Sequence, residues 1–586
     1  MILVFGGTTE GRKAVEVLEE GVSPYFYSTK TGEQDITLHH GQRIDGALDV
    51  EAMQTFCGEH DIRLIVDAAH PFASQLHQTI ALVSQSLNIP TIRYERIYPK
   101  RDPEITWIDD YSQIPRDIHS LLATTGVQSI SKLKPLEVAG VKVFYRILNR
   151  ESSIALAQKQ GASPEQLCYY ENPQDIPVEA EAILLKESGL SGGFSEKVEA
   201  AKARGMRIIA LKRPQTPAIF TIVNGPYGLR RMVEKLLPEF YPLHSGLTTG
   251  TCATAAAMAA TIRLLKNETP EEVPVLLPNG ETIHVSVGYG DGYAYCIKDA
   301  GDDPDVTDGL EIRVSVKPIP ADTPTRSLSG AFEILGGEGV GVFTLPGFDY
   351  PPGSPAINKA PREMIRQNLA AVTNDSLSIT ISVPEGETIA KRTFNPRLGI
   401  EGGISIIGVS GIVKPFSEEA FIDSIRKCMT IAKASGSSRV VINSGGKSER
   451  FVKALYPNLP QQAFVEYGNY IGETLKIAHE LGIREVTLGV MLGKAVKLAA
   501  GHLDTHSRKA TMDKAFISEM LHEAGCQADL EKITLARELW QAIPPDKTED
   551  FCRVVLQHCM NHCRPLVPQA RLTLLLIDDD GIIHSQ

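Results

Sequence analysis

The first residues of the chain, MILVFGGTTEG, combine a short apolar run with a glycine-containing turn that could hold a phosphate. A strand followed by glycines and a helix start places backbone N–H groups beside an anion, as in sheets that bind dinucleotides. Gly6 and Gly11 occupy the outer glycine positions of the dinucleotide-binding motif, but Thr8 replaces the middle glycine, where pyrophosphate approaches the backbone. A cofactor turn and a tight structural turn both remain open.

Three other apolar runs end in polar residues that could contact a ligand. One ends at Ser28 and Lys30, where a ribose is bound in such sheets and where Lys30 could pair with a 2′-phosphate. A second ends at Asp67 and continues to His70, which either acts in an active site or caps the following helix. The third ends at Lys186, and the N–H groups that follow either bind an anion or belong to a flexible connection.

A basic run surrounds two tyrosines in the first half of the chain; it comprises Arg93, Arg96, Lys100 and Arg101. Such a run is usually a solvated face. In an acidic protein it could instead bind the carboxylates of a substrate. We keep Arg93 and Arg96 as candidate substrate-binding residues.

Apolar runs that alternate with amphipathic segments predict the elements that position these residues. The predicted strands cover residues 2–5, 24–29, 62–68, 121–124, 141–147, 182–186 and 207–211. Strands separated by helices favour a doubly wound parallel sheet of the Rossmann-like α/β class, with ligands at the carboxyl ends of the strands.

Composition limits the remaining classes of function. A chain of 586 residues with 42% hydrophobic and 22% charged residues is typical of several globular domains. A net charge of −12 without a basic tract argues against nucleic acid as a partner. No apolar run reaches the roughly 18 residues of a membrane span. We see no signal peptide, and nine scattered cysteines fit a reducing compartment, so we expect a cytoplasmic chain that does not bind membranes.

The strings ILVFGGTTEGR, IVDAAHPFA, RYERIYP, KESGLSGGFSEKVEAA and KRP together resemble the precorrin-6A reductase family, from Met1 to about Pro238. The resemblance implies reduction of a macrocycle double bond by NAD(P)H. It implies that cofactor phosphates border Gly6, Gly7, Thr8, Thr9 and Glu10, and that the cleft is bordered by Asp67, His70, Pro71, Phe72, Lys186, Ser188 and Gly189. Hydride comes from the cofactor, and His70 or Asp67 could help to deliver the proton. Ala69 and the string KESGLSGG depart from the family pattern.

A second beginning lies inside the chain at His244, where HSGLTTGTCATAAAMAA runs from a threonine-rich turn into a helix of small residues. N–H groups at that helix start could hold an anion, which makes Thr249 and Gly250 candidate cofactor-binding residues. A helix exit and short linker precede it at residues 238–242. We expect one region at residues 1–240 and another at residues 244–586.

Residues 272–295 alternate like antiparallel strands, and three polar or glycine-rich strings follow them. In DAGDDPDVTDG, the carboxylates of Asp299, Asp302 and Asp303 either line a pocket in a hydrogen-bonded loop, which we favour, or hold a metal; the string lacks the glycine and glutamate of an EF-hand. The other two strings, YPPGSPAINKAPREMI and FNPRLGIEGGISIIGVSGIVKP, supply polar anchors and glycines that either approach a ligand or pack tightly: Asn358, Arg362, Asn395, Arg397, Gly402 and Gly403.

The last part of the chain contains another strand-and-turn signal. Residues 440–443 predict a strand, and the turn after it contains Asn443, Gly445 and Gly446, which could bind a cofactor. A helix is predicted over residues 461–481 and a strand over residues 486–489. Beyond this strand lie two lysines one helical turn apart and two polar residues after a C-terminal glycine: Lys494, Lys497, Thr505 and His506. The lysines either cover apolar surface or bind a carboxylate-rich ligand.

Three cysteines in one predicted helix, Cys552, Cys559 and Cys563, share a face. We favour a buried cysteine face over a metal site, because tetrahedral sites rarely come from a single helix. We therefore predict no metal site.

The strings GLTTGTCATAAAMAA, DAGDDPDVTDG, GEGVGVFTLPG, SPAINKAPREMI, NPRLGIEGGISIIGVSGIV and GKAVKLAAGHLDTHS resemble the cobalt-precorrin-5B C1-methyltransferase family, from His244 to the last strand. The resemblance implies S-adenosyl-L-methionine as methyl donor and an α+β fold of non-Rossmann type. Because the implied tetrapyrrole carries many carboxylates, we expect Arg362, Arg397, Lys494 and Lys497 to bind it. The strings at residues 443–446 and 509–513 depart from the family pattern.

The two resemblances imply consecutive steps of corrin-ring (cobalamin) biosynthesis on one cobalt-precorrin, so we expect a bifunctional enzyme. The alternative is an active reductase that carries a non-catalytic corrinoid-binding module. Other enzymes of corrin synthesis are candidate partners. The residues leave open whether NADH or NADPH is used and how many chains assemble.

Overall fold

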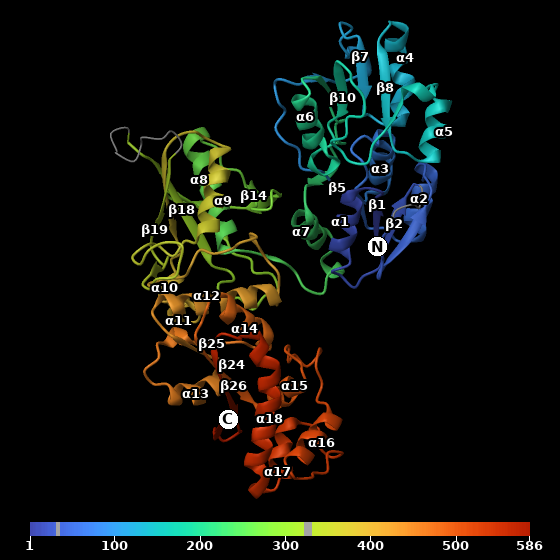
Figure 1. Ribbon diagram of the computed structural model, residues 1–586. Coiled ribbons are helices and arrows are strands. Elements are labelled where there is room, and N and C mark those ends of the chain that lie inside the picture. Colours follow the sequence, from blue (N-terminus) through green and yellow to red (C-terminus); the bar gives the residue numbers. More distant parts are fainter. Residues whose placement is uncertain (31–34, 321–330, 586) are drawn as a thin grey trace. The chain divides into compact units, whose positions relative to one another are not determined.

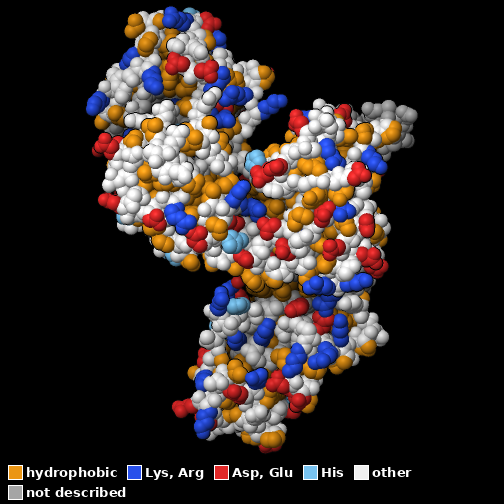
Figure 2. Space-filling model, turned by 180° about the vertical axis from the view of Figure 1, so that it is seen from behind, with side chains coloured by type: hydrophobic (Ala, Val, Ile, Leu, Met, Phe, Trp, Pro, Cys, Tyr) orange, Lys and Arg blue, Asp and Glu red, His pale blue; other side chains and the backbone are white. Residues whose placement is uncertain are grey.

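The computed structural model describes residues 1–30, 35–320 and 331–585, and the chain forms two compact units (Figure 1). The first unit comprises Met1–Ser245 and Pro274–His284, and the second comprises Gly246–Val273 and Val285–Gln586. No described helix has the length and hydrophobicity that a membrane span requires. On the face shown in Figure 2, acidic and basic side chains are interspersed over the surface.

The first unit contains two six-stranded sheets whose neighbouring strands all run parallel. The first sheet has the order β12-β5-β4-β1-β2-β3, the arrangement of a dinucleotide-binding sheet. Its strands are β1 (Ile2–Phe5), β2 (Tyr25–Thr29), β3 (Gly41–Asp45), β4 (Leu64–Asp67), β5 (Thr91–Tyr94) and β12 (Thr221–Val223). The predicted parallel, doubly wound architecture is confirmed, but in two sheets rather than one.

The second sheet repeats the order of the first, as β6-β11-β10-β7-β8-β9. Its strands are β6 (Thr106–Ile108), β7 (Ser120–Ala123), β8 (Lys142–Ile147), β9 (Leu167–Tyr169), β10 (Ala182–Lys186) and β11 (Arg207–Leu211). The two sheets exchange one edge strand each, β6 and β12. After β5 the chain enters the second sheet as β6 beside β11, and after β11 it returns to the first sheet as β12 beside β5.

Helices cover both faces of each sheet because apolar residues alternate in direction along buried strands. In the first sheet, α1 (Thr9–Leu18) and α7 (Pro226–Leu236) pack on one face, while α2 (Val50–Glu59) and α3 (Ser74–Leu87) pack on the other. In the second sheet, α4 (Ile130–Val138) and α5 (Glu151–Lys159) lie opposite α6 (Phe194–Ala203).

The second unit begins with a helix that is buried over most of its length. Thr248 caps α8 (Thr249–Lys266) by accepting a 3.2 Å hydrogen bond from the Thr251 amide. Every residue from Thr249 to Thr261 is buried, because the small side chains let α8 pack closely against α9 (Lys359–Ala370) and against the sheet beside it (Figure 1).

That sheet is mixed and has the order β16-β17-β18-β21-β19, in which only β19 and β21 run parallel. Its strands are β16 (Gly288–Gly290), β17 (Tyr293–Ile297), β18 (Glu311–Pro318), β19 (Phe332–Gly336) and β21 (Leu377–Ser382). A hairpin of β14 (Glu272–Leu276) and β15 (Thr282–Ser286) precedes it in the chain, but most of this hairpin belongs to the first unit. Shorter elements follow: β13 (Gly246–Leu247) paired with β23 (Ile412–Val413), β20 (Val342–Phe343) paired with β22 (Ile400–Glu401), α10 (Gly386–Ala390) and α11 (Asn395–Leu398).

The last part of the second unit is a further wound sheet, with the order β25-β24-β26-β27-β28. Its strands are β24 (Arg439–Asn443), β25 (Phe464–Glu466), β26 (Glu485–Met491), β27 (Arg571–Ile577) and β28 (Ile583–Ser585), and all but β28 run parallel. Numbered along the chain this order is 2-1-3-4-5, which differs from that of the first unit. The predicted helix over residues 461–481 is wrong in its first part, because β25 lies there and the helix starts only at Ile471.

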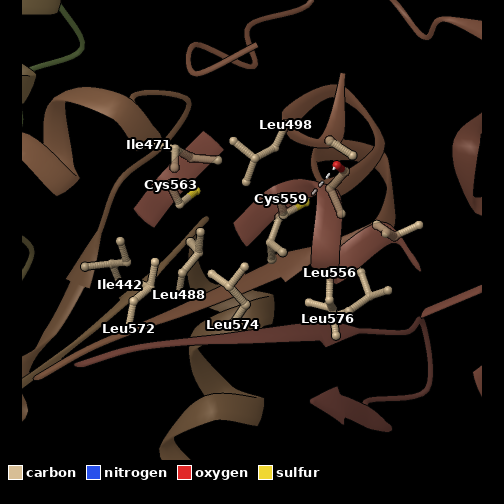
Figure 3. Close-up of a cluster of buried hydrophobic side chains, with 14 of the residues drawn as sticks. Ile442, Ile471, Leu488, Leu498, Leu556, Cys559, Cys563, Leu572, Leu574 and Leu576 are labelled. Atoms are coloured by element: carbon tan, nitrogen blue, oxygen red, sulfur yellow. Dashed lines mark hydrogen bonds between the residues drawn. The ribbon is translucent and has the colours of Figure 1, made fainter. Parts of the chain in front are cut away.

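Helices enclose this last sheet on both faces. On one face lies α13 (Gly446–Leu455), and on the other lie α12 (Glu418–Ala434), α14 (Ile471–Glu480), α15 (Leu492–Ala499) and α18 (Thr548–Cys563). Two short helices, α16 (Lys514–Glu523) and α17 (Leu539–Ala542), complete the larger core. Cys559 and Cys563 lie within this core, and the Cys559 thiol donates to the Ala495 carbonyl at 3.3 Å (Figure 3). Burial raises the pKa of Cys563 to about 12.

The core of the last sheet predicts a large effect of Leu488→Ala. Leu488 in β26 is fully buried among aliphatic side chains (Figure 3), so the substitution should lower the free energy of unfolding by about 2–5 kcal/mol. Urea unfolding followed by Trp540 fluorescence in a Trp107→Phe background reports on the second unit alone. Leu455→Ala is the control, because Leu455 is 48% exposed; an equal loss for both variants would contradict the assigned packing.

Candidate functional sites

The turn after β1 lies at the carboxyl edge of the first sheet, between β1 and β4. Thr8 caps α1: its hydroxyl accepts from the Gly11 amide at 3.0 Å and donates to the Ala68 carbonyl at 2.7 Å. Gly7 has φ +85°, and no atom lies within 4 Å of the position a Cβ would occupy. This open backbone position leaves room for a phosphate, whereas Gly6 is needed because Tyr27 fills the space of any side chain there.

Asp67 and Arg93 form an internal network rather than part of a ligand surface. Asp67 is fully buried at the end of β4, and its carboxylate accepts from Arg93 at 2.9 Å and from His77 at 2.6 Å. Arg93 is only 2% exposed and also bonds the Asp67 carbonyl. We therefore revise the expectations that Asp67 delivers a proton and that Arg93 binds substrate, because neither group can reach a ligand.

His70 lies at the same edge and is partly exposed. Its Nδ1 accepts from the Phe72 amide at 3.2 Å, so the proton of the neutral ring is on Nε2. Burial, with the charges of Arg96 and Lys186, lowers the pKa of His70 to about 3. The ring is therefore neutral near pH 7, where it can donate a hydrogen bond but cannot act as a cationic acid.

Arg96 joins the two sheets of the first unit. Its Nε donates to Glu10 at 2.9 Å and its Nη1 to the Ser188 carbonyl at 2.7 Å, while the Ser191 hydroxyl also bonds Glu10. Arg96 and Glu10 are both buried. The expectation that Arg96 binds substrate carboxylates is therefore revised: its guanidinium is held by Glu10 and by the loop after β10.

Lys186, at the end of β10, is a partly buried lysine close to His70. Lys186 lies 5.0 Å from the Phe72 ring centroid, and burial, with the nearby charge of Lys132, lowers its pKa to about 8. In the following loop Gly189 has φ +71° and packs against Arg96, while the Ser188 hydroxyl donates to the Gly192 carbonyl. The structure thus places Glu10 and Lys186 close enough to His70 for their charges to influence its ring.

A second lysine of this region had no recognisable signal in the sequence. Lys197 in α6 donates to the Gly192 carbonyl at 2.9 Å, and burial, with the charges of Arg146 and Arg96, lowers its pKa to about 8. At the end of β2, Ser28 is buried and Lys30 is exposed. Of these two, only Lys30 is placed to reach a ligand in solution.

The start of α8 differs from the expectation for Thr249 and Gly250. Both residues are buried beneath residues 405–411: the Gly250 amide donates to the Ile407 carbonyl at 2.9 Å, and Thr249 accepts from the Ile407 amide at 2.9 Å. A Cβ on Gly250 would lie 2.8 Å from Pro361. The Gly250 N–H and the Thr249 hydroxyl already have partners and both residues are buried, so we withdraw Thr249 and Gly250 as cofactor-binding residues.

Several polar anchors of the middle region hold loops together. Arg362 is buried and donates to the carbonyls of Ile357 and Ile334. Asn395 is buried and donates to the Gly403 carbonyl, and a Cβ on Gly403 would lie 2.2 Å from a backbone oxygen. The expected ligand roles of Arg362, Asn395 and Gly403 are therefore revised to packing. Asn358 is partly exposed and Gly402 is exposed, so both remain candidates.

The carboxylates of residues 299–309 mostly bond their own loop. Asp299 accepts from the Gly301 amide at 2.9 Å, and Asp303 accepts from the Phe416 amide at 3.0 Å. Asp305 binds the buried Lys298 at 2.9 Å. Within residues 1–30, 35–320 and 331–585, no group of three or more His, Cys, Asp or Glu side chains is arranged to hold a metal. Asp299 and Asp302 are exposed and remain candidate ligand contacts.

The turn after β24 lies where the order of the last sheet reverses, which is the ligand position in wound sheets. Asn443 is fully buried, and its side-chain oxygen accepts from the Gly445 amide at 3.0 Å. Gly445 has φ +139°, which favours glycine, and it precedes α13. Gly446 is exposed, and the space a Cβ would occupy is open.

The basic and polar residues of the second unit gather near this turn. Lys494 donates to the Gly468 carbonyl and Lys497 donates to the Thr505 carbonyl at 3.2 Å. Thr505 is buried, and His506 accepts from the Arg508 amide at 3.1 Å. Arg397 forms an ion pair with Glu449 in α13, so it is not free to bind substrate unless that pair opens.

A cavity of about 300 Å³ lies beside the start of α15. It is lined by the carboxyl ends of β26 and β27, and among its walls are Met491, Gly493, Trp540 and Asp579. Lys447 of the turn after β24 reaches Asp579 at 3.5 Å. The turn and the cavity are therefore adjacent along one edge of the sheet.

These features define an α/β protein with wound parallel sheets, in which the candidate ligand positions lie at the carboxyl ends of the strands. A family model described as "Precorrin-6x reductase CbiJ/CobK" matches residues 1–225, and one described as "CbiD" matches residues 238–415. The chain belongs to the cobalt-precorrin-5B C(1)-methyltransferase family. It is an enzyme in which a methyltransferase-family region follows a reductase-family region.

Two relatives illustrate the match. The cobalt-precorrin-5B C(1)-methyltransferase of Prosthecochloris aestuarii is 42% identical over 357 residues, which cover 58% of this chain and 95% of the relative. That of Thermus thermophilus is 43% identical over 285 residues, covering 48% and 75%. A solved CobK precorrin-6A reductase is 18% identical and covers 41% of this chain and 98% of its own, but its TM-score of 0.34 supports no conclusion about the fold.

The buried Asp67 network predicts that Asp67→Asn destabilises the first unit. The substitution leaves the buried Arg93 guanidinium with Glu95, at 3.4 Å, as its remaining counterion, so the free energy of unfolding should fall by about 3 kcal/mol. Urea unfolding followed by Trp107 fluorescence in a Trp540→Phe background measures it. Glu239→Gln, which breaks the exposed Arg63–Glu239 pair, should change stability by less than about 1 kcal/mol. Unchanged stability with lost turnover in Asp67→Asn would instead support a catalytic role.

Proposed function

We propose that this chain catalyses two consecutive steps of corrin-ring biosynthesis: C1 methylation of cobalt-precorrin-5B to cobalt-precorrin-6A in the second unit, and reduction of cobalt-precorrin-6A to cobalt-precorrin-6B in the first. The observation that carries the proposal is that two families acting on precorrins match successive stretches of one chain. Each region also has its own glycine turn at the reversal point of a parallel sheet. As functional regions we propose residues 1–240 and 244–586.

For the reductase step we propose that NAD(P)H binds across the carboxyl edge of the first sheet. The open space at Gly7 fits a phosphate, the remaining turn residues Gly6, Thr8 and Thr9 shape the backbone around it, and the exposed Lys30 could bind a 2′-phosphate. When bound, the nicotinamide supplies hydride. Neutral His70 and the loop at Ser188 and Gly189 would border the macrocycle.

We propose that Lys186, rather than Asp67 or His70, provides the proton for the reduction. Its ammonium lies at a strand end beside His70, and a pKa of about 8 leaves it protonated near neutral pH but able to release a proton. In the protonated state it would also attract a macrocycle carboxylate. Asp67 keeps a positioning role, because it holds His77 and Arg93 beneath the edge.

For the methyl transfer we propose that S-adenosyl-L-methionine binds at the turn formed by Asn443, Gly445 and Gly446. The open space at Gly446 and the adjacent cavity of about 300 Å³ support this location. When bound, the sulfonium supplies the methyl group. Transfer to carbon depends mainly on alignment, so this chain's contribution is to hold donor and ring together.

We propose that the ring's carboxylates contact the lysines beyond β26. Lys494 and Lys497 are partly buried and stand next to Thr505 and His506, so they could bind acidic side chains of the substrate. Asn358, Gly402 and the exposed Asp299 and Asp302 would contact other parts of the ring. Arg397 could join them only after leaving Glu449.

Methyl transfer tests this proposal directly. The full chain should transfer labelled methyl from S-adenosyl-L-methionine to cobalt-precorrin-5B, and with NADPH the product should then gain two hydrogens, both followed by mass spectrometry. Binding of the macrocycle without methyl transfer would instead identify the second unit as a non-catalytic binding module. Failure to bind any precorrin would overturn both assignments.

The reductase step should depend on the protonation of Lys186. Burial lowers its pKa to about 8, so the charged form is present below pH 8 and is lost as the pH rises through 8. We expect kcat of the reduction to fall above pH 8. Lys186→Arg should remove this decline but also lower kcat, because arginine keeps its charge and does not release a proton in this pH range. Lys186→Met should lower kcat at every pH by about 10²–10⁴-fold.

Lys197→Arg is the matched control, because Lys197 has the same pKa of about 8 but donates to the Gly192 carbonyl. In this variant the decline should remain near pH 8. If Lys197→Arg removes the decline and Lys186→Arg does not, Lys186 is not the proton donor.

A further inference from the structure

Glu466 is the last residue of β25, at the edge of the parallel sheet in the second unit. In the register of the sheet it lies beside Asn443, the residue that begins the turn after β24. A Cβ on Gly445 would lie 3.0 Å from its Oε1, so the carboxylate rests against that turn. Glu466 thus places a carboxylate against the proposed methyl-donor turn, on the side away from β26.

The Glu466 carboxylate is partly buried but has no donor. In the part of the chain that the structure describes, no group donates a hydrogen bond to it or forms an ion pair with it. Burial raises its pKa, an effect that the more distant Arg397 and Lys494 oppose and Glu449 increases. By contrast, the neighbouring Glu449 is bound by both Arg397 and Lys453.

A partly buried carboxylate without donors is unfavourable, and such groups usually find hydrogen-bond partners. Internal partners are not arranged here: Arg397 bonds Glu449 instead, and Lys494 donates to the Gly468 carbonyl. Water can donate to this partly exposed carboxylate, and a ligand that displaced the water would supply the donors in its place. Because the carboxylate can accept several hydrogen bonds, a group with two adjacent hydroxyls fits it.

The spacing along the chain agrees with this inference. In wound sheets that bind nucleosides, an acidic residue about 20 residues after the glycine turn, at the end of the neighbouring strand, accepts from ribose hydroxyls. Glu466 follows Gly446 at this distance and ends the strand next to β24. The strand order differs from that of the dinucleotide-binding sheet, but the relation between first strand, turn and neighbouring strand is the same.

A hollow of about 20 Å³, which has room for roughly one water molecule, lies beside Glu466. It includes Glu466 in its wall and is otherwise lined largely by apolar side chains, among them Phe394, Phe421, Ile425 and Phe464. Gln461 and Gln462 supply polar groups on the same wall. Because the hollow cannot enclose a base, a base would lie across its aromatic rim with one face open to solvent.

We propose that Glu466 binds the two ribose hydroxyls of the methyl donor and thereby selects a nucleoside with an intact diol. The inference rests on the proposed function in one respect, that S-adenosyl-L-methionine binds at the turn of Asn443, Gly445 and Gly446. In this arrangement the base extends over the hollow beside Phe464, and the sulfonium end lies on the β26 side of the turn.

Calorimetric titration of the full chain with S-adenosylhomocysteine and with its 2′,3′-dideoxyribose analogue tests the proposal. The unaltered protein should bind S-adenosylhomocysteine at least 10-fold more tightly than the dideoxy analogue, because two hydrogen bonds to a charged group are lost. Glu466→Gln and Glu466→Ala should weaken S-adenosylhomocysteine by about 10–100-fold while binding the dideoxy analogue as the unaltered protein does.

Glu419→Gln is the control, because Glu419 is exposed on α12; this variant should bind both ligands normally. Reductase activity of the first unit and the unfolding midpoint of the second verify that each variant is folded. Variants that keep full discrimination between the two ligands, or lose both equally, would overturn the role of Glu466 while leaving the donor site intact. Failure of the unaltered chain to bind S-adenosylhomocysteine would overturn the proposed donor site and the inference with it.

Discussion

Parallel strands cannot be joined by tight turns; each connection must cross the sheet and return, and this constraint shapes the parallel sheets of both units. It places one set of connections at the carboxyl edges of the strands, where Gly7, Gly126 and Gly445 occupy turns with positive φ. Where the strand order reverses, neighbouring connections diverge and leave a crevice. The candidate sites of both units follow from this geometry, although the two families that match the chain are different.

Buried charge is the second feature that organises the first unit. Asp67 with Arg93, and Glu10 with Arg96, are ion pairs whose members come from distant segments. Such pairs contribute little net stability compared with apolar packing, but losing one member leaves an uncompensated charge. Glu10 and Arg96 link the turn after β1 to the loop after β10, so the edges of the two sheets are coupled by hydrogen bonds.

The sequence was sufficient for elements set by local pattern. Residues 182–186 and 207–211 were predicted as strands and are β10 and β11. Both are largely apolar runs of five residues bounded by turn residues, a length typical of a buried strand and too short for most helices. It was insufficient where long-range partners decide. Thr91–Tyr94 is a buried strand despite Arg93, whose counterion Asp67 lies 26 residues earlier. Arg96 and Arg362 resembled substrate-binding residues because their internal partners are invisible in one sequence, and Glu466 was hidden within a predicted helix.

The exchange of β6 and β12 has a mechanical consequence for the first unit. Each sheet of the first unit, with its covering helices, forms one lobe. The edge strand of each lobe is connected along the chain to strands of the other lobe. Neither lobe can therefore be removed without breaking the backbone hydrogen bonds of an edge strand. Two segments, between β5 and β6 and between β11 and β12, connect the two lobes. Rotation of the lobes about these two connecting segments would leave the pairing of β6 and β12 intact and could enclose a ligand. Sliding of one lobe past the other would break the hydrogen bonds of both edge strands.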